Sequence, residues 1–101
     1  MEWTIAKEND TLVLAPEGDL DVANAAVLRQ VLQQALDSGD CTRLDVDMSA
    51  VTFLDSSALG VLVAARRAAA AKDVTLRIRE PGPMVRMVLE VTNLYDSLVT
   101  G

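Results

Sequence analysis

Three consecutive residues, Asp55, Ser56 and Ser57, place a carboxylate and two hydroxyl groups directly before a stretch with helical patterning. Ser and Asp are favoured there because their side-chain oxygens accept hydrogen bonds from the free N–H groups of a helix's first turn. One interpretation is therefore a simple helix cap. The other is a phosphate acceptor, because open amides and the positive end of the helix dipole stabilise an added dianion. The spacing alone leaves both interpretations open.

The composition argues against the common catalytic and metal sites. The chain has no His, which removes the commonest general base and metal ligand and every Ser-His or Cys-His nucleophile pair. Cys41 is the single cysteine, so it forms no internal disulfide, and no His or basic residue beside it in the sequence would activate it. Asp21, Asp45 and Asp47 could be imagined as a hard-cation site, but carboxylates on one strand face are more simply a solvated edge. We therefore predict no catalytic residue, no metal and no cofactor.

Length and charge narrow the class of protein further. The chain has 101 residues, enough for one domain, and its net charge is −6 with a pI near 4.4. Binding to nucleic acid or to anionic lipid needs clustered Lys and Arg, which this balance does not supply. The N-terminus lacks the apolar core of a signal peptide, and no apolar run approaches the roughly 20 residues of a membrane span. We expect a cytoplasmic protein with no nucleic-acid partner and no direct membrane insertion.

Hydrophobic periodicity predicts the elements that must position these residues. Apolar residues at helical spacing indicate helices, and strict apolar–polar alternation indicates strands. A polar turn at residues 8–10 is typical of a hairpin, and the run that begins at Pro16 is expected to end the second strand. The expected strands cover residues 3–7, 11–15, 43–48 and 74–79, and the expected helices cover 22–36, 56–72 and 84–91. This order predicts an α/β domain with a mixed, mostly parallel sheet after an initial hairpin.

The alternation in residues 43–48 (RLDVDM) indicates how the helices are arranged. In a sheet covered on both faces, Asp45 and Asp47 would be buried without partners, at a cost of roughly 2–7 kcal/mol each. We therefore expect the helices on one face only and both carboxylates facing solvent. Phe53, in the segment 51–54 that leads into the second helix, is expected to lie in the core.

Two motifs resemble those of a known family. The stretch 47–62 (DMSAVTFLDSSALGVL) closely resembles the signature of the STAS domain, the fold of bacterial anti-sigma factor antagonists. That signature has a polar strand end, a Phe two residues before an Asp, and then Asp-Ser-Ser/Thr-Gly-Leu-Gly. The run 18–21 (GDLD) stands where the family carries Gly-Glu-Leu-Asp before its first helix. The resemblance covers nearly the whole chain and implies a single STAS domain over residues 1–101.

Carried over by position, the resemblance implies a role for four residues. Ser56 matches the serine that is phosphorylated by a partner kinase which is also the anti-sigma factor. Asp21 and Asp55 match acidic positions at the partner-facing end, and Ser57 matches the second hydroxyl.

The sequence departs from the family pattern in two places. Ala58 replaces the common Gly, which adds a Cβ that we expect to lie near the approach route of a kinase. The chain also ends at Gly101, where family members usually continue into another helix.

The function implied by the resemblance is non-enzymatic. The unphosphorylated protein would bind an anti-sigma factor with kinase activity, and phosphate on Ser56 would block that complex. Two alternatives remain. In the first, the domain is a constitutive scaffold subunit of a stressosome-like or lipid-transport ATPase complex, with Ser56 only a helix cap. In the second, Ser56 and Asp55 form a hydrolase site, which is disfavoured because adjacent residues at a helix start point in different directions and no base is available.

Overall fold

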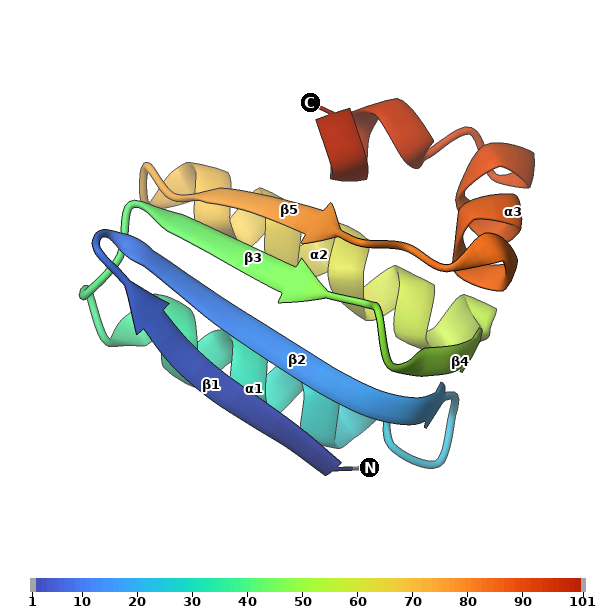
Figure 1. Ribbon diagram of the computed structural model, residues 1–101. Coiled ribbons are helices and arrows are strands. Elements are labelled where there is room, and N and C mark those ends of the chain that lie inside the picture. Colours follow the sequence, from blue (N-terminus) through green and yellow to red (C-terminus); the bar gives the residue numbers. More distant parts are fainter. Residues whose placement is uncertain (1, 101) are drawn as a thin grey trace.

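The computed structural model describes residues 2–100 and shows a five-stranded sheet with helices (Figure 1). The strands are hydrogen-bonded in the order β1-β2-β3-β5, and β4 pairs with β2 outside this path. β1 and β2 are antiparallel, and the other strand pairs are parallel. The elements are β1 (Glu2–Glu8), β2 (Thr11–Leu20), α1 (Ala25–Asp37), β3 (Arg43–Asp47), β4 (Val51–Leu54), α2 (Ser56–Ala71), β5 (Thr75–Arg79), α3 (Pro83–Val91) and the π-helical turn η1 (Asp96–Thr100). The predicted α/β fold with a mixed, mostly parallel sheet is confirmed.

β2 is twice as long as expected because it serves two partners in succession. Its first half pairs with β3 from Thr11 to Leu14, and its last residues pair with β4 from Gly18 to Leu20. Pro16 lies between these two stretches, where no parallel neighbour requires an N–H donor, so it does not end the strand. Gly18 has a φ of +83°, and its N–H donates to the Ala50 carbonyl at 2.9 Å. The expected end of this strand at residue 15 was therefore wrong.

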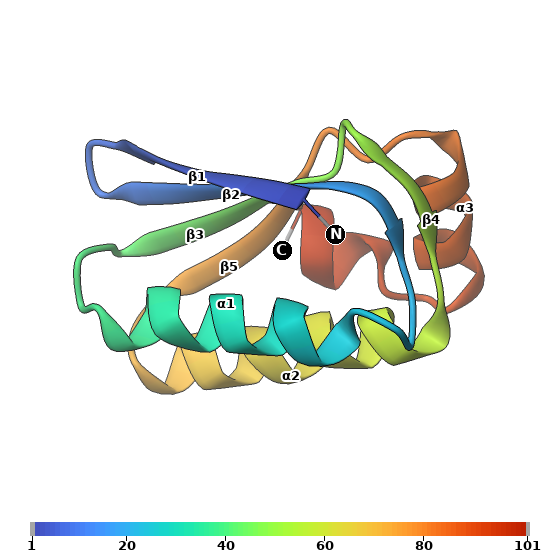
Figure 2. The same cartoon turned by 90° about the horizontal axis from the view of Figure 1, so that it is seen from below.

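α1 and α2 cover one face of the sheet, as predicted (Figure 2). The core between the layers is formed by apolar side chains of the strands and helices, and many of them are fully buried. Examples are Leu14, Val46, Ile78, Leu28, Leu32 and Leu62. α3 packs against β4, and η1 packs against β5. Among residues 2–100, no helix combines the length and the apolarity that a membrane crossing requires.

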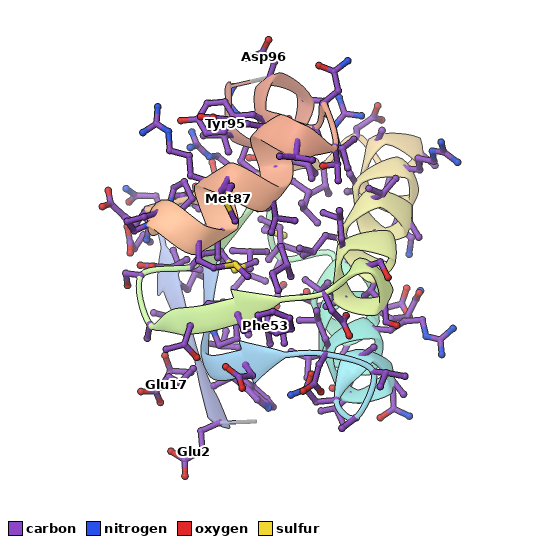
Figure 3. The ribbon with its side chains drawn as sticks, turned by 90° about the vertical axis from the view of Figure 1, so that its right-hand side faces the viewer. Glu2, Glu17, Phe53, Met87, Tyr95 and Asp96 are labelled. Carbon is purple, nitrogen blue, oxygen red and sulfur yellow. The ribbon has the colours of Figure 1, made fainter. Side chains whose placement is uncertain are left out.

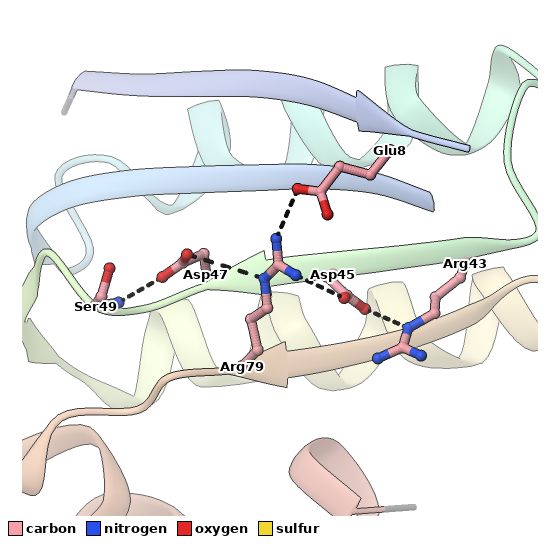
Figure 4. A network of polar contacts seen from close by, with 6 residues as sticks. All are labelled: Glu8, Arg43, Asp45, Asp47, Ser49 and Arg79. Carbon is pink, nitrogen blue, oxygen red and sulfur yellow. Dashed lines mark hydrogen bonds and ion pairs between the residues drawn. The ribbon is translucent and has the colours of Figure 1, made fainter. Parts of the chain in front are cut away.

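The sheet face opposite α1 and α2 carries a network of charged side chains (Figure 4). Asp45 lies there with only 2% of its surface exposed, so the expectation that it faces solvent was wrong. Its Oδ1 accepts from the Arg43 Nε at 2.8 Å, and its Oδ2 lies 3.6 Å from the Arg79 Nη1. The burial has a simple cause: long arginine side chains lie over the carboxylate although no helix does. Asp47 is intermediate, with a side chain 23% exposed.

Phe53 was expected in the core but is 40% exposed. β4 buries its first and last residues, Val51 and Leu54, and exposes the two between them. A register shift in the pairing with β2 causes this pattern, because Val51 pairs with Gly18 while Phe53 pairs with Asp19. Figure 3 shows the Phe53 ring at the end of the molecule that is formed by β4 and α3.

Candidate functional site

The predicted phosphate-acceptor serine begins α2, and its neighbour caps the helix. Asp55 is the N-cap residue, with extended backbone angles, and its Oδ1 accepts from the Ala58 N–H at 2.9 Å. Ser56 is the first helical residue and is exposed, while Ser57 and Asp55 are half-buried. The capping interpretation of this motif therefore applies to Asp55. The Ser56 hydroxyl is left accessible at the positive end of the α2 dipole.

Asp55 also connects α2 to a second loop. The loop between β2 and α1 spans residues 21–24, and its Val22 N–H donates to the Asp55 Oδ2 at 3.0 Å. The Asp55 N–H donates in turn to the Leu20 carbonyl at 3.0 Å. In Figure 2, β2 and β4 run side by side down to the starts of α1 and α2, which brings this loop beside the predicted serine. The two oxygens of the Asp55 carboxylate thus accept hydrogen bonds from two different segments, α2 and the 21–24 loop.

The 21–24 loop is ordered by its own side chains. The Asp21 Oδ1 accepts from the Ala23 N–H at 2.9 Å, and the Asp21 N–H donates to the Asn24 Oδ1 at 2.9 Å. The Asn24 Nδ2 donates to the Asp19 carbonyl at 2.7 Å. These turn bonds are typical of Asp and Asn side chains before a helix. They also explain why α1 begins at Ala25 and not at the expected residue 22.

Asn24, Thr52 and Asp19 take part in the site although none of them was predicted as a site residue. The Thr52 Oγ1 donates to the Asp19 Oδ1 at 2.6 Å, which connects β4 to the end of β2. An Asn three residues after an Asp, directly before a helical stretch, is a turn signal that could have indicated Asn24. The Thr52 bond depends on which strand lies beside β2, and the sequence carries no such signal.

Ala58 does not lie on an approach route to Ser56. Its side chain is completely buried, with 0% exposure, and belongs to the core cluster. The expectation that its Cβ would stand near an approaching kinase was wrong, because the third residue of α2 points toward the sheet while the first points to solvent.

Cys41 lies outside this site and has the character of a structural residue. The residue is 9% exposed and belongs to the core cluster. Burial raises the pKa of the Cys41 thiol, so less of the reactive thiolate is present at neutral pH.

The sheet order, the single helical layer and a capped helix that presents an exposed serine define a class of small α/β domain. The chain belongs to the STAS domain family, because the sequence model of the family described as "Mlab, STAS domain" matches residues 3–100.

Several solved structures share this fold. An anti-sigma factor antagonist from Mycobacterium paratuberculosis is 23% identical, with a TM-score of 0.83 over 96% of this chain and 81% of that one. The phosphorylated form of the Bacillus cell fate determinant SpoIIAA is 21% identical, with a TM-score of 0.75 over 97% of this chain and 89% of that one. The murine anion transporter Slc26a9 is 16% identical, with a TM-score of 0.76 over 94% of this chain and 16% of that one. The fold thus occurs both in small proteins and inside a much larger one.

Proposed function

We propose that this protein is an anti-sigma factor antagonist, which binds an anti-sigma factor with serine-kinase activity and is switched off by phosphorylation of Ser56. One observation carries the proposal: Ser56 is an exposed residue, while Asp55 provides the helix cap. A partner can therefore reach the hydroxyl, and modification of it leaves the cap bond in place. The family membership and the fold shared with an antagonist and with phosphorylated SpoIIAA support the same role.

The switch follows from charge. The γ-phosphoryl group of ATP is transferred to the Ser56 Oγ, the hydroxyl proton is released and ADP departs; the kinase supplies ATP and Mg²⁺. The phosphate adds about −1.5 to −2 charges to an end of the domain that holds the Asp19, Asp21 and Asp55 carboxylates. A surface that accommodated a neutral hydroxyl then faces a dianion beside other anions, and the complex dissociates.

The protein acts by binding and has no catalytic activity of its own in this proposal. A hydrolase would need Asp55 as the base for Ser56, but each Asp55 oxygen already accepts a backbone N–H. We also propose that the protein works in the cytoplasm, where an anti-sigma factor would be found.

A second candidate function is a constitutive STAS subunit of a larger assembly. The match to a segment that makes up 16% of the length of an anion transporter favours this candidate, because there the same fold is part of a larger protein. In this case Ser56 would need no modification.

Mass spectrometry after incubation with the cognate kinase and ATP distinguishes the two candidates. Co-purification from the native host first identifies the kinase. We expect phosphate on Ser56 of the wild type. The Ser56→Ala variant should carry no phosphate at residue 56, and the Ser57→Ala variant should still be phosphorylated. Phosphate on Ser57 alone would contradict the residue assignment. A complex that forms with neither serine modified would support the constitutive subunit.

A further inference from the structure

The two oxygens of Asp55 have separate roles, which the position of this residue in the sequence motif does not reveal. Oδ1 accepts the Ala58 N–H and caps α2, and Oδ2 accepts the Val22 N–H from a loop 33 residues earlier in the chain. A helix cap needs only the first of these bonds. The second bond joins the loop that contains Asp21 to the turn that precedes Ser56.

We propose that Asp55 is a positioning residue: it does not contact the partner but holds the 21–24 loop so that Asp21 and Ser56 are presented together. This inference rests on the proposed function. It differs from the expectation that Asp55 itself binds the partner, because each of its oxygens already accepts one N–H within the chain.

The remaining bonds of the loop explain why this one matters. The Asp21 N–H donates to the Asn24 side chain, and the Asn24 side chain donates to the Asp19 carbonyl, so these bonds hold the internal shape of the loop. Asp19 lies near the end of β2, and Asp21 and Asn24 lie in the loop that leads from β2 to α1. The Asp55 carboxylate, at the start of α2, adds a hydrogen bond to the Val22 N–H of this loop. The loop, whose shape its own bonds already hold, is thereby also fixed against the start of α2.

Two substitutions separate the roles of the two oxygens. Asp55→Asn keeps one acceptor oxygen, and Asn caps helices about as well as Asp, so we expect the Ala58 amide to stay protected while Val22 loses its acceptor. Asp55→Ala removes both acceptors. Asp19→Asn is the matched control, because it removes the same charge from the same end of the molecule and keeps an oxygen for Thr52.

Amide hydrogen exchange of the folded, full-length protein tests the positioning role without a partner. A hydrogen bond to a charged group that is accessible to solvent lies at the lower end of its range, so we expect Val22 to exchange about tenfold faster in Asp55→Asn and in Asp55→Ala. In Asp19→Asn the Val22 exchange rate should equal that of the wild type. Unchanged Val22 protection in Asp55→Ala would overturn the proposal.

A double-mutant cycle tests whether the held loop matters for recognition. It measures the affinity of the unphosphorylated protein for the anti-sigma factor. We expect Asp55→Asn to weaken binding about tenfold and Asp21→Ala to have a much smaller effect in the Asp55→Asn background than in the wild type. Equal effects of Asp21→Ala in the two backgrounds would overturn the positioning role. If the wild type binds no anti-sigma factor, the proposed function fails, whereas the exchange experiment still decides whether Asp55 holds the loop.

Discussion

Two carboxylates in this protein are held in opposite ways. Asp55 accepts hydrogen bonds from two backbone N–H groups, whereas Asp45 is held by the guanidinium groups of Arg43 and Arg79. Backbone amides cannot swing away, so the Asp55 bonds fix the relative position of two segments. Arginine side chains are flexible, and their main effect is to neutralise and cover a buried charge. The first arrangement suits a recognition site and the second suits the stability of the sheet.

The largest expected effect is on recognition. Ser56→Asp places a carboxylate on an exposed residue beside Asp55, so we expect partner affinity to fall about 100-fold, since like charges across an interface cost several kcal/mol. The free energy of unfolding should change by less than about 0.5 kcal/mol, because the substitution is on the surface. Calorimetric titration and urea denaturation measure the two quantities. Wild-type affinity in Ser56→Asp would show that charge at this residue does not control the complex.

The next effect concerns the buried carboxylate. Asp45→Ala leaves Arg43 and Arg79 without their shared acceptor, but their side chains are 44% and 34% exposed and can be rehydrated. We therefore expect a loss of about 1–3 kcal/mol in the free energy of unfolding, below the cost of a fully enclosed pair.

Glu8→Ala is the control for the Asp45 experiment. Glu8 pairs with the same Arg79 at 3.2 Å, but its side chain is 57% exposed, so we expect a change within about 0.5 kcal/mol in the same urea denaturation. Equal losses in the two variants would show that burial does not distinguish these carboxylates.

A smaller effect separates the cap from the acceptor. Asp55→Ala should lower the free energy of unfolding by about 0.5–2 kcal/mol, because α2 loses its cap. Ser56→Ala should change it by less than about 0.5 kcal/mol, because Ser56 is exposed and another residue supplies the cap. Thermal and urea denaturation of the two variants measure the difference between their free energies of unfolding. The reverse order would assign the cap to Ser56.

A moderate stability effect is expected at Phe53. A fully buried Phe would cost roughly 3–5 kcal/mol on replacement by Ala, but Phe53 is 40% exposed. We expect Phe53→Ala to lower the free energy of unfolding by about 1 kcal/mol, near the average for a point substitution. A loss above about 3 kcal/mol in urea denaturation would place the ring in the core.

The sequence predicted the order of most elements and the position of Ser56 at the start of a helix, because periodicity and turn residues are local signals. It did not predict how β2 continues past Pro16, since that depends on a change of strand partner. Alternation placed Asp45 on the face without helices, but only the register of β3 and β5 shows that arginines cover it. Asp55 and Ser56 are equally good caps by type, so only the structure distinguishes them.

The double pairing of β2 has a consequence for the order in which the protein folds. The β1–β2 hairpin joins residues close in the chain, so it can form as soon as both strands exist. The end of β2 must wait for β4, and the Val22 amide must wait for Asp55, 33 residues later. Closing such a loop costs entropy before any contact is gained. During synthesis, therefore, the hairpin can form before the site, and the loop that contains Asp21 can be held by Asp55 only after the start of α2 has emerged.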